Sequence, residues 1–206
     1  MTTRAPRRDA VENRAGILSA ARSTLASDPH ASVDVIARSA GLSRRTLYGH
    51  FDDRDALIRE LISSGAQRFN AIAESVTDDD SRLALARLAS RLWEEAAHVQ
   101  VAAALALDEA HVEHTAAALA PLRRAVAGLV ERGQDDGSFR RDLAAPTLAR
   151  LIEETARTAI ARTDAATEGA SNLAVRAVLS IAGLSWREVD ALLAAHAGIV
   201  ATDTPS

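Results

Sequence analysis

The residues best suited to chemistry are hydrogen-bond donors gathered in residues 43–54. Hydroxyl, imidazole and guanidinium groups of this kind hold phosphate oxygens and read base edges. Ser43 is a good N-cap for a very short basic helix that begins at Arg44. A helix of that length does not persist alone in water, so neighbouring elements must hold it at the surface. Reading the major groove requires such a helix, so the stretch predicts a DNA-reading unit.

Two further helices must position this short helix, and both have recognisable ends. Ser32 predicts the N-cap of a preceding helix, and Gly41 predicts the tight turn that ends it, because glycine accepts a left-handed conformation. Asp53 predicts the N-cap of a longer helix that follows, to about Ser75. Apolar residues recur at helical spacing in the first helix, at Val35, Ile36 and Ala40, and in the longer one, at Leu57, Leu61, Ile62, Gly65, Phe69 and Ile72.

Four segments of the chain carry a close resemblance to a known family: Ile17–Ala21, Ile36–Ser43, Thr46–Phe51 and Arg54–Leu57. They resemble the DNA-binding domain of the TetR family, the tetracycline-repressor-like regulators, and cover about the first third of the chain. A weaker similarity lies at Arg132–Leu143. The resemblance implies an all-α fold, with an N-terminal three-helix helix-turn-helix domain and a C-terminal helical domain for ligand binding and dimerisation. It also implies a DNA-binding regulator, typically a repressor, that responds to a small molecule.

The resemblance also implies a division of labour among the donors. Arg44 and Arg45 read base edges from the start of the short helix. Thr46, Tyr48 and His50 hold phosphates, as does Arg54, where the start of a helix adds its own attraction for anions. Ser32 caps its helix and donates to a phosphate at once. The expected DNA-binding residues are Ser32, Ser43, Arg44, Arg45, Thr46, Tyr48, His50 and Arg54.

Two residues depart from the family pattern. Gly49 falls inside the expected short helix, where glycine costs roughly 1 kcal/mol relative to alanine, and it removes a side chain that many relatives aim at DNA. Asp34 stands where some relatives place a cation that contacts a base. We expect Asp34 to interact favourably with its helix N-terminus rather than with DNA.

Charge is distributed unevenly along the chain. Residues 1–51 hold eight arginines against four acidic residues, a formal charge of +4. The other residues therefore carry a formal charge of −8, since the net charge of the chain is −4. A basic N-terminal segment on an acidic body indicates one local site for a polyanion, while the acidic body repels DNA elsewhere. Every basic residue is Arg, which codon bias in a GC-rich genome explains. Arginine nevertheless offers base edges a bidentate fork that lysine lacks.

The composition favours an intracellular helical protein. The chain has 206 residues, with 10 Gly and 5 Pro, and is rich in Ala, which indicates helices with short connections. No period-two run of β-branched residues predicts a sheet. With no Cys there is no disulfide framework, and no apolar run reaches the ~20 residues that span a bilayer. No signal peptide is recognisable, so we expect a cytoplasmic protein with no membrane partner and no cofactor.

Residues that begin and end helices divide the chain into three predicted parts. The DNA-binding domain is expected over 1–52, with a disordered basic arm at 1–9 that either lies against DNA or is a solvated tail. A connecting helix follows at 53–75, and the ligand-binding and dimerisation domain covers 76–206. Helices are expected over 9–25, 82–97, 99–108, 109–119, 121–133, 146–162 and 171–183, and from a capping box at Ser185–Glu188 to Gly198.

Two of these helices are expected to form the homodimer interface, because a pseudo-palindromic operator is best matched by a two-fold protein. They open near Pro146 and Ser171, and a four-helix bundle across the two-fold axis could bury their apolar faces. Those faces carry Leu148, Leu151, Ile152, Thr155 and Ala159 on the first helix, and Val175, Val178, Leu179 and Ala182 on the second.

An effector pocket is expected among the helices of the acidic body. Their many small apolar side chains suit a mainly apolar ligand, with Trp93 as the lining residue and His98 or His111 as a polar partner. Core packing is the alternative role for Trp93. His111 and His114 are one helical turn apart, but with ordinary helix acids they give only a weak metal signal. The alternative function is a helical small-molecule-binding protein or enzyme whose N-terminal helices do not bind DNA.

Overall fold

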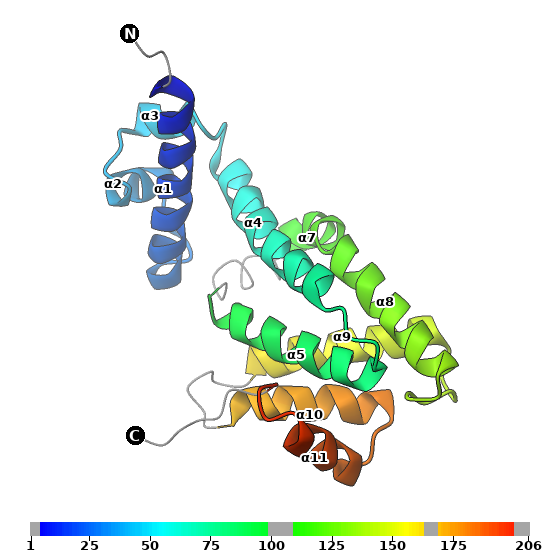
Figure 1. The fold of residues 1–206 in the computed structure, drawn as a ribbon. Helices are drawn as coiled ribbons and strands as arrows, with labels where there is room; N and C mark the ends of the chain where they lie inside the picture. The colour runs from blue at the N-terminus through cyan, green and yellow to red at the C-terminus, as the bar shows by residue number, and fades with distance from the viewer. Residues whose placement is uncertain (1–4, 99–108, 163–168, 200–206) are drawn as a thin grey trace, which may run out of the picture. The chain divides into compact units, whose positions relative to one another are not determined.

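The computed structural model describes residues 5–98, 109–162 and 169–199, and in these ranges helices are the only regular secondary structure (Figure 1). The chain divides into two compact units. Unit 1 comprises Met1–Ala66 and Val99–Ala118, and unit 2 comprises Gln67–His98 and Leu119–Ser206. No described helix is both long and apolar enough to cross a membrane.

Unit 1 begins with the three helices that the sequence predicts. They are α1 (Ala5–Ser27), α2 (Val33–Ser39) and α3 (Arg44–Tyr48), and α4 (Arg54–Ser75) follows and continues into unit 2. The start of α1 differs from the prediction, because residues 5–9 are helical rather than a disordered arm. Pro6 stands in the first turn, where a missing N–H is tolerated. Unit 1 also contains η1 (Glu109–His111) and α7 (Val112–Ala118), so the helix expected over 109–119 opens with a 3₁₀ turn.

The core of unit 1 buries one face of α1 and corrects the apolar stripe predicted for α2. Ile17, Ala21 and Leu25 are buried. On α2, however, Val33, Ile36 and Ala37 face the core, whereas Val35 is exposed. Burial of apolar side chains from several elements holds helices that are too short to be stable alone. The core is completed by Ala31, Leu47, Phe51, Leu57 and Leu61.

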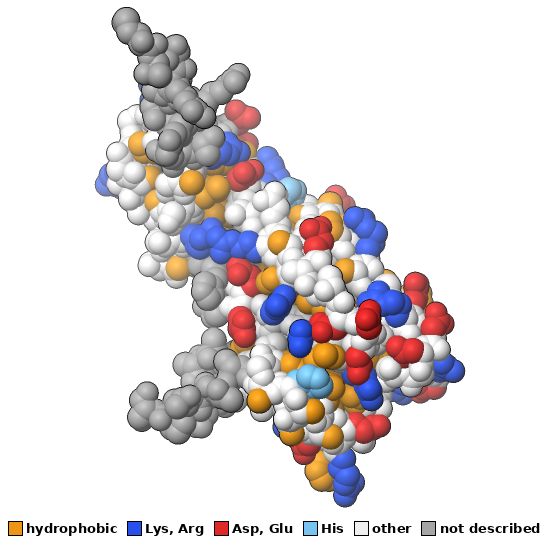
Figure 2. Space-filling model, viewed as in Figure 1, with side chains coloured by type: hydrophobic (Ala, Val, Ile, Leu, Met, Phe, Trp, Pro, Cys, Tyr) orange, Lys and Arg blue, Asp and Glu red, His pale blue; other side chains and the backbone are white. Residues whose placement is uncertain are grey.

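Unit 2 is a packed group of helices, and α10 packs against both α5 and α9 (Figure 1). Its core includes Leu85, Val130 and Leu148. On the face that Figure 2 shows, acidic and basic side chains are interspersed over this unit. Besides the end of α4, the helices are α5 (Ser81–His98), α8 (Ala120–Asp135), α9 (Ala145–Arg162), α10 (Ala170–Ala182) and α11 (Trp186–Ala195).

Helix ends in unit 2 follow the expected capping chemistry with two exceptions. The Ser185–Glu188 capping box and the positive φ of Gly183 are confirmed. Helix α10, however, is opened by Gly169 in the left-handed conformation, not by Ser171, and α11 ends at Ala195, before Gly198. The helix expected over 99–108 and the end of the chain lie outside the described residues.

The faces expected to form a dimer interface are largely buried inside the chain itself. Because α9 and α10 pack against each other and against α5, their apolar stripes already belong to the core of unit 2. The prediction is therefore wrong for Leu148, Ile152, Val175, Val178, Leu179 and Ala182. Leu151 on α9 and Leu173 on α10 remain on the surface, with exposed fractions of 41% and 55%.

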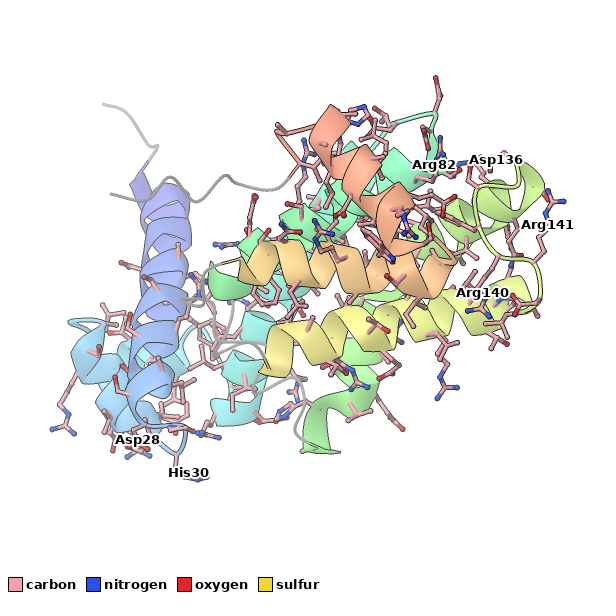
Figure 3. The ribbon with its side chains drawn as sticks, turned by 90° about the horizontal axis from the view of Figure 1, so that it is seen from below. Asp28, His30, Arg82, Asp136, Arg140 and Arg141 are labelled. Carbon is pink, nitrogen blue, oxygen red and sulfur yellow. The ribbon has the colours of Figure 1, made fainter. Side chains whose placement is uncertain are left out.

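The loop between α8 and α9 depends on a close approach at Gly133. Helix α8 continues past this residue to Asp135, and the Phe139 ring packs against Gly133. A Cβ at Gly133 would lie 2.1 Å from Cδ2 of Phe139. Arg140, in the same loop (Figure 3), donates its backbone N–H to Ala182 at 2.9 Å, which ties the loop to the end of α10. Residues of the segment Arg132–Leu143 therefore pack this loop onto α8 and tie it to the end of α10.

Gly133→Ala should destabilise unit 2 by about 1–3 kcal/mol, because the added methyl group overpacks against a buried ring. Gly128→Ala is the matched control on the same helix, since a Cβ there meets nothing within 4 Å. That substitution should stabilise the protein by up to about 1 kcal/mol through helix propensity. Urea unfolding of both variants tests the pair, and equal stability of Gly133→Ala and the wild type would contradict the packing argument.

Candidate nucleic-acid interface

Caps at both ends of the turn fix where α3 begins. The Ser32 hydroxyl accepts the backbone N–H of Val35 at 3.4 Å, which confirms it as the cap of α2. Gly41 has φ +69°, the left-handed conformation expected for the turn. Ser43 accepts the N–H of Thr46 at 3.1 Å, and the two hydroxyl oxygens lie 2.8 Å apart. The first turn of α3 is therefore held by side chains rather than by its own length.

The inner side of α3 is anchored and its outer side is exposed. Leu47 is fully buried in the core of unit 1, and this leaves Arg44, Arg45 and Tyr48 on the surface. Gly49 is the C-cap of α3, with φ −71°, and not an interior residue as the sequence suggests. Its N–H is accepted by the carbonyls of Arg45 and Thr46, so the position ends the helix. A five-residue helix with a buried anchor can present its polar side chains without unwinding.

Arg44 and Arg45 have different surroundings although they are adjacent. The Arg44 Nη1 lies 3.1 Å from Oδ2 of Asp34, and its guanidinium carbon lies 5.4 Å from the centroid of the Tyr48 ring. The Tyr48 side chain first, and the Asp34 carboxylate second, raise the pKa of Arg44. Asp34 thus pairs with Arg44, besides standing in the first turn of α2. Arg45 has no side-chain partner among the described residues.

Arg54 fastens the start of α4 to the turn between α1 and α2. Its Nη2 donates to the Pro29 carbonyl at 2.8 Å, and its Nε donates to the Ala31 carbonyl at 3.2 Å. In the same turn, where Figure 3 labels Asp28 and His30, the Asp28 carboxylate accepts the His30 N–H at 3.0 Å. Asp53 caps α4 by accepting the Ala56 N–H at 2.6 Å, as expected. Two nitrogens of the Arg54 guanidinium group, Nε and Nη2, are therefore engaged with backbone carbonyls.

Arg14 is a further positioning residue, and the sequence reasoning missed it. Its Nη1 donates to the His50 carbonyl at 3.0 Å, its Nη2 lies 3.3 Å from Glu60, and its guanidinium carbon lies 4.5 Å from the Phe51 ring centroid. These contacts join α1 to the end of α3 and to α4. The sequence held little signal for this, because an isolated Arg on a helix is ordinarily a solvated residue.

The two histidines considered for a pocket or a metal bind α4 instead. The Nε2 of His111, which is only 6% exposed, lies 2.7 Å from Oδ1 of Asp55. The Nε2 of His114 lies 2.9 Å from the Ser63 hydroxyl and 3.1 Å from the Arg59 carbonyl. Within the part of the chain that the structure describes, no cluster of three or more His, Cys, Asp or Glu residues could hold a metal ion.

Trp93 packs in a small apolar cluster of unit 2. It is 8% exposed and contacts Ala174, with Ala159 and Ile160 packed against the pair. This contact set matches the core role that the sequence left open. His98 ends α5, and its side chain lies outside the described residues.

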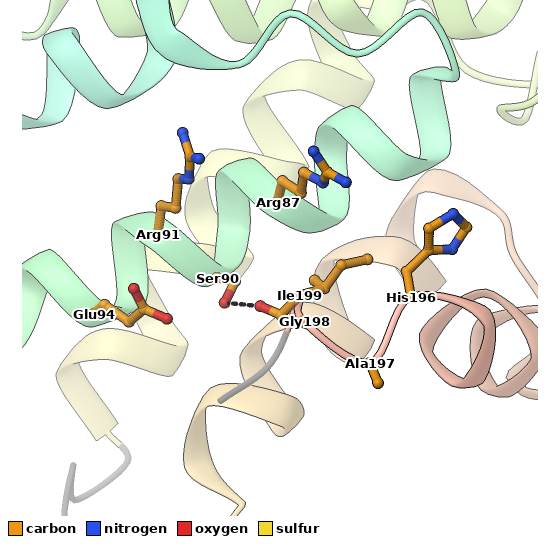
Figure 4. Close-up of a pocket in the computed structure, with 8 residues that line it drawn as sticks. All are labelled: Arg87, Ser90, Arg91, Glu94, His196, Ala197, Gly198 and Ile199. Carbon is orange, nitrogen blue, oxygen red and sulfur yellow. Dashed lines mark hydrogen bonds between the residues drawn. The ribbon is translucent and has the colours of Figure 1, made fainter. Parts of the chain in front are cut away.

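A surface pocket of about 340 Å³ lies elsewhere in unit 2, between α5 and the segment after α11 (Figure 4). Trp93 does not line it. Its charged lining residues are Arg87, Arg91 and Glu94, while Ser90 is hydrogen-bonded to the Ile199 carbonyl. Arg87 pairs with Asp78 at 3.1 Å, and Arg91 donates to the Ser75 hydroxyl at 2.8 Å. The two arginines are therefore engaged with groups of unit 2.

Comparison with known proteins agrees with this geometry. Residues 17–61 match the sequence model of the family described as bacterial regulatory proteins, tetR family. That match includes the whole of α2 and α3 and the turn between them. No curated protein sequence matches the chain.

Solved structures share the fold over most of the chain. The TetR family transcriptional regulator PfmR from Thermus thermophilus is 19% identical, with a TM-score of 0.71 over 81% of this chain and 96% of its own. The fatty acid degradation regulator FadR from Bacillus halodurans is 19% identical, with a TM-score of 0.70 over 84% and 96%. FadR from Bacillus subtilis, solved with stearoyl-CoA, is 16% identical, with a TM-score of 0.69 over 82% and 97%.

The capped, anchored basic helix α3 lies in the segment that matches this family model, and a helical body follows it. Over residues 17–61 the chain is similar to the tetR family of bacterial regulatory proteins, and solved TetR-family transcriptional regulators share its fold.

Proposed function

We propose that the chain is a repressor that binds a pseudo-palindromic operator as a homodimer and is released from it by a small, mainly apolar effector. The observation that carries the proposal is the exposed polar face of α3, held in place by caps on both sides and by the buried Leu47. The family match covers this element, and its members are ligand-responsive DNA-binding regulators. Because the proposed binding partner is genomic DNA, the proposed site of action is the cytoplasm.

The proposed contacts assign base reading to Arg44 and Arg45, since the N-terminal residues of a recognition helix reach base edges. The proposed phosphate donors are the side chains of Ser32, Ser43, Thr46, Tyr48 and His50. Ser32 and Ser43 are also N-caps, and the Thr46 hydroxyl lies beside that of Ser43. Arg54 contributes through its remaining N–H groups and through the N-terminal end of α4.

The proposed division of the chain follows from these roles. Residues 1–52 bind DNA, residues 53–75 connect, and residues 76–206 bind ligand and dimerise. Helix α4 has residues in both compact units, so a change in one can be transmitted along a continuous helix to the other. Ligand binding releases DNA only if it favours a dimer whose recognition helices no longer match the operator half-sites.

The proposed effector is a mainly apolar molecule. One relative of the same fold, FadR from Bacillus subtilis, was solved with stearoyl-CoA. In this chain the ligand site is proposed at the apolar cluster around Trp93, and His98 stays the expected polar partner. His111 offers such a ligand only its Nδ1, which is buried and has no hydrogen-bond partner among the described residues.

Arg44→Ala should lower discrimination between operator and scrambled DNA by roughly tenfold or more, because a guanidinium that reads a guanine carries sequence information. Tyr48→Phe and Arg54→Ala should weaken binding to both duplexes alike. Arg124 is an exposed arginine on α8, far along the chain, and Arg124→Ala removes the same charge. This substitution should leave the discrimination between operator and scrambled DNA unchanged. Gel shifts over a salt series measure both affinities. Equal weakening of both duplexes by Arg44→Ala would show that this arginine holds phosphate.

The homodimer is proposed to form through the outward faces of α9 and α10, where Leu151 and Leu173 are exposed. Leu151→Glu and Leu173→Glu should shift the particle from dimer to monomer and abolish operator binding, because each would bury an unpaired carboxylate. Val112→Glu alters an equally exposed apolar residue of unit 1 and should remain dimeric. Light scattering at micromolar concentration gives the masses, and a monomeric wild type would exclude the dimer.

Effector coupling can be tested with acyl-CoA thioesters, free fatty acids and small phenols as probes. Trp186→Phe leaves Trp93 as the only tryptophan, so its fluorescence reports binding near that side chain. A probe that alters this fluorescence and raises the melting temperature should also weaken the operator complex. A probe that stabilises the protein while operator affinity stays unchanged would refute the coupling.

A further inference from the structure

Asp34 is fixed at the start of α2 with one carboxylate oxygen turned toward α3. It is the second residue of α2, directly after the capped N-terminus. Its Oδ1 is shielded from solvent and has no hydrogen-bond partner among the described residues, whereas Oδ2 lies 3.1 Å from Nη1 of Arg44. Ten residues separate the two side chains, so the pair joins the two helices of the helix-turn-helix unit.

The contact restricts Arg44 without covering it. A guanidinium has five N–H donors, and Asp34 takes only one of them. The Arg44 side chain keeps 64% of its surface exposed, so its remaining donors are available to a ligand. On its other side the guanidinium lies over the Tyr48 ring. An acidic residue and an aromatic residue thus fix the direction of an otherwise flexible side chain.

A free arginine on a DNA-facing helix has two competing uses. Phosphates attract it from many directions and carry no sequence information, whereas a base edge accepts its fork in one orientation. A fixed carboxylate beside the guanidinium offsets part of its charge and repels phosphate oxygens. It therefore weakens the first use and, by holding the side chain in one direction, lowers the entropy cost of the second.

We propose that Asp34 is a positioning residue that sets sequence specificity, holding Arg44 in the orientation that reads a base and keeping it from the phosphates. This role rests on the proposed function, because it requires that Arg44 contact DNA. Arg45, which has no partner among the described residues, is the arginine left free for either use.

Asp34→Asn removes the charge and preserves the shape, so it should raise affinity for scrambled DNA while the operator gains little. Discrimination should fall on the order of tenfold, the scale of one lost base contact. If the freed guanidinium moves to a phosphate, the slope of log K against log salt should steepen by about 0.9. A purely structural role for Asp34 would not change this slope.

The operator probe is a duplex that the wild-type chain selects from a random-sequence pool, and the reference probe is the same duplex with its bases scrambled. Asp52→Asn is the matched control, since it makes the same charge change at an exposed acid between α3 and α4. It should raise affinity for both duplexes equally. Asp34→Glu keeps the charge near the start of α2, so it should lose part of the discrimination with an unchanged salt slope.

A double-mutant cycle separates the outcomes. If Asp34 acts through Arg44, Asp34→Asn should have no effect on discrimination in the Arg44→Ala background. A loss of the same size in that background, or unchanged or higher discrimination in Asp34→Asn alone, would overturn the role of Asp34. If the wild type selects no preferred duplex, the proposed function itself fails, and the role of Asp34 fails with it.

Discussion

The structure of unit 1 depends on how a five-residue helix is kept folded at a surface. The entropy cost of nucleating a helix exceeds the stabilisation that one turn provides. Helix α3 is therefore folded only because contacts with other parts of the chain stabilise it. Ser43 supplies its first hydrogen bond, and Leu47 inserts into a core made by α1, α2 and α4. The chain then leaves through Phe51, whose buried ring lies under Arg14. These contacts fix the position of α3, and so they set the direction in which the side chains of its outer face leave the helix.

Arginine performs two opposite tasks in this unit. Arg14 and Arg54 donate to backbone carbonyls of His50, Pro29 and Ala31, where a planar group with several donors can join separate segments. Arg44 and Arg45 instead leave most of their donors to solvent. The net charge of the N-terminal segment therefore overstates what is available to a polyanion, because part of it is already engaged in holding the fold.

The sequence predicted what is encoded locally. Ser32, Gly41, Ser43 and Asp53 each act within a few residues, and the structure confirms all four. Contacts between distant residues left no such signal. Nothing near Arg54 in the sequence indicates the Pro29 carbonyl, and nothing near His111 indicates Asp55.

The predicted dimer interface was wrong for a related reason. Helical periodicity shows that one side of α9 and of α10 is buried, but it does not show by what. Leu148 and Val178 fit an interface and a core equally well by spacing, and the packing of α5 against α10 decides for the core. Gly49 was misassigned because helix length cannot be read from propensity when tertiary contacts set it.

Unit 1 is completed by a second segment of the chain, which has consequences for coupling. The chain leaves unit 1 after Ala66, returns at Val99 and leaves again after Ala118, so the units are joined by three covalent connections. The returning segment is bound to α4 by the contacts His111–Asp55 and His114–Ser63. A net hydrogen bond contributes about 1 kcal/mol, and allosteric coupling energies are typically about 1–3 kcal/mol. Displacing this segment from α4 therefore costs a free energy of the same order as a typical allosteric coupling.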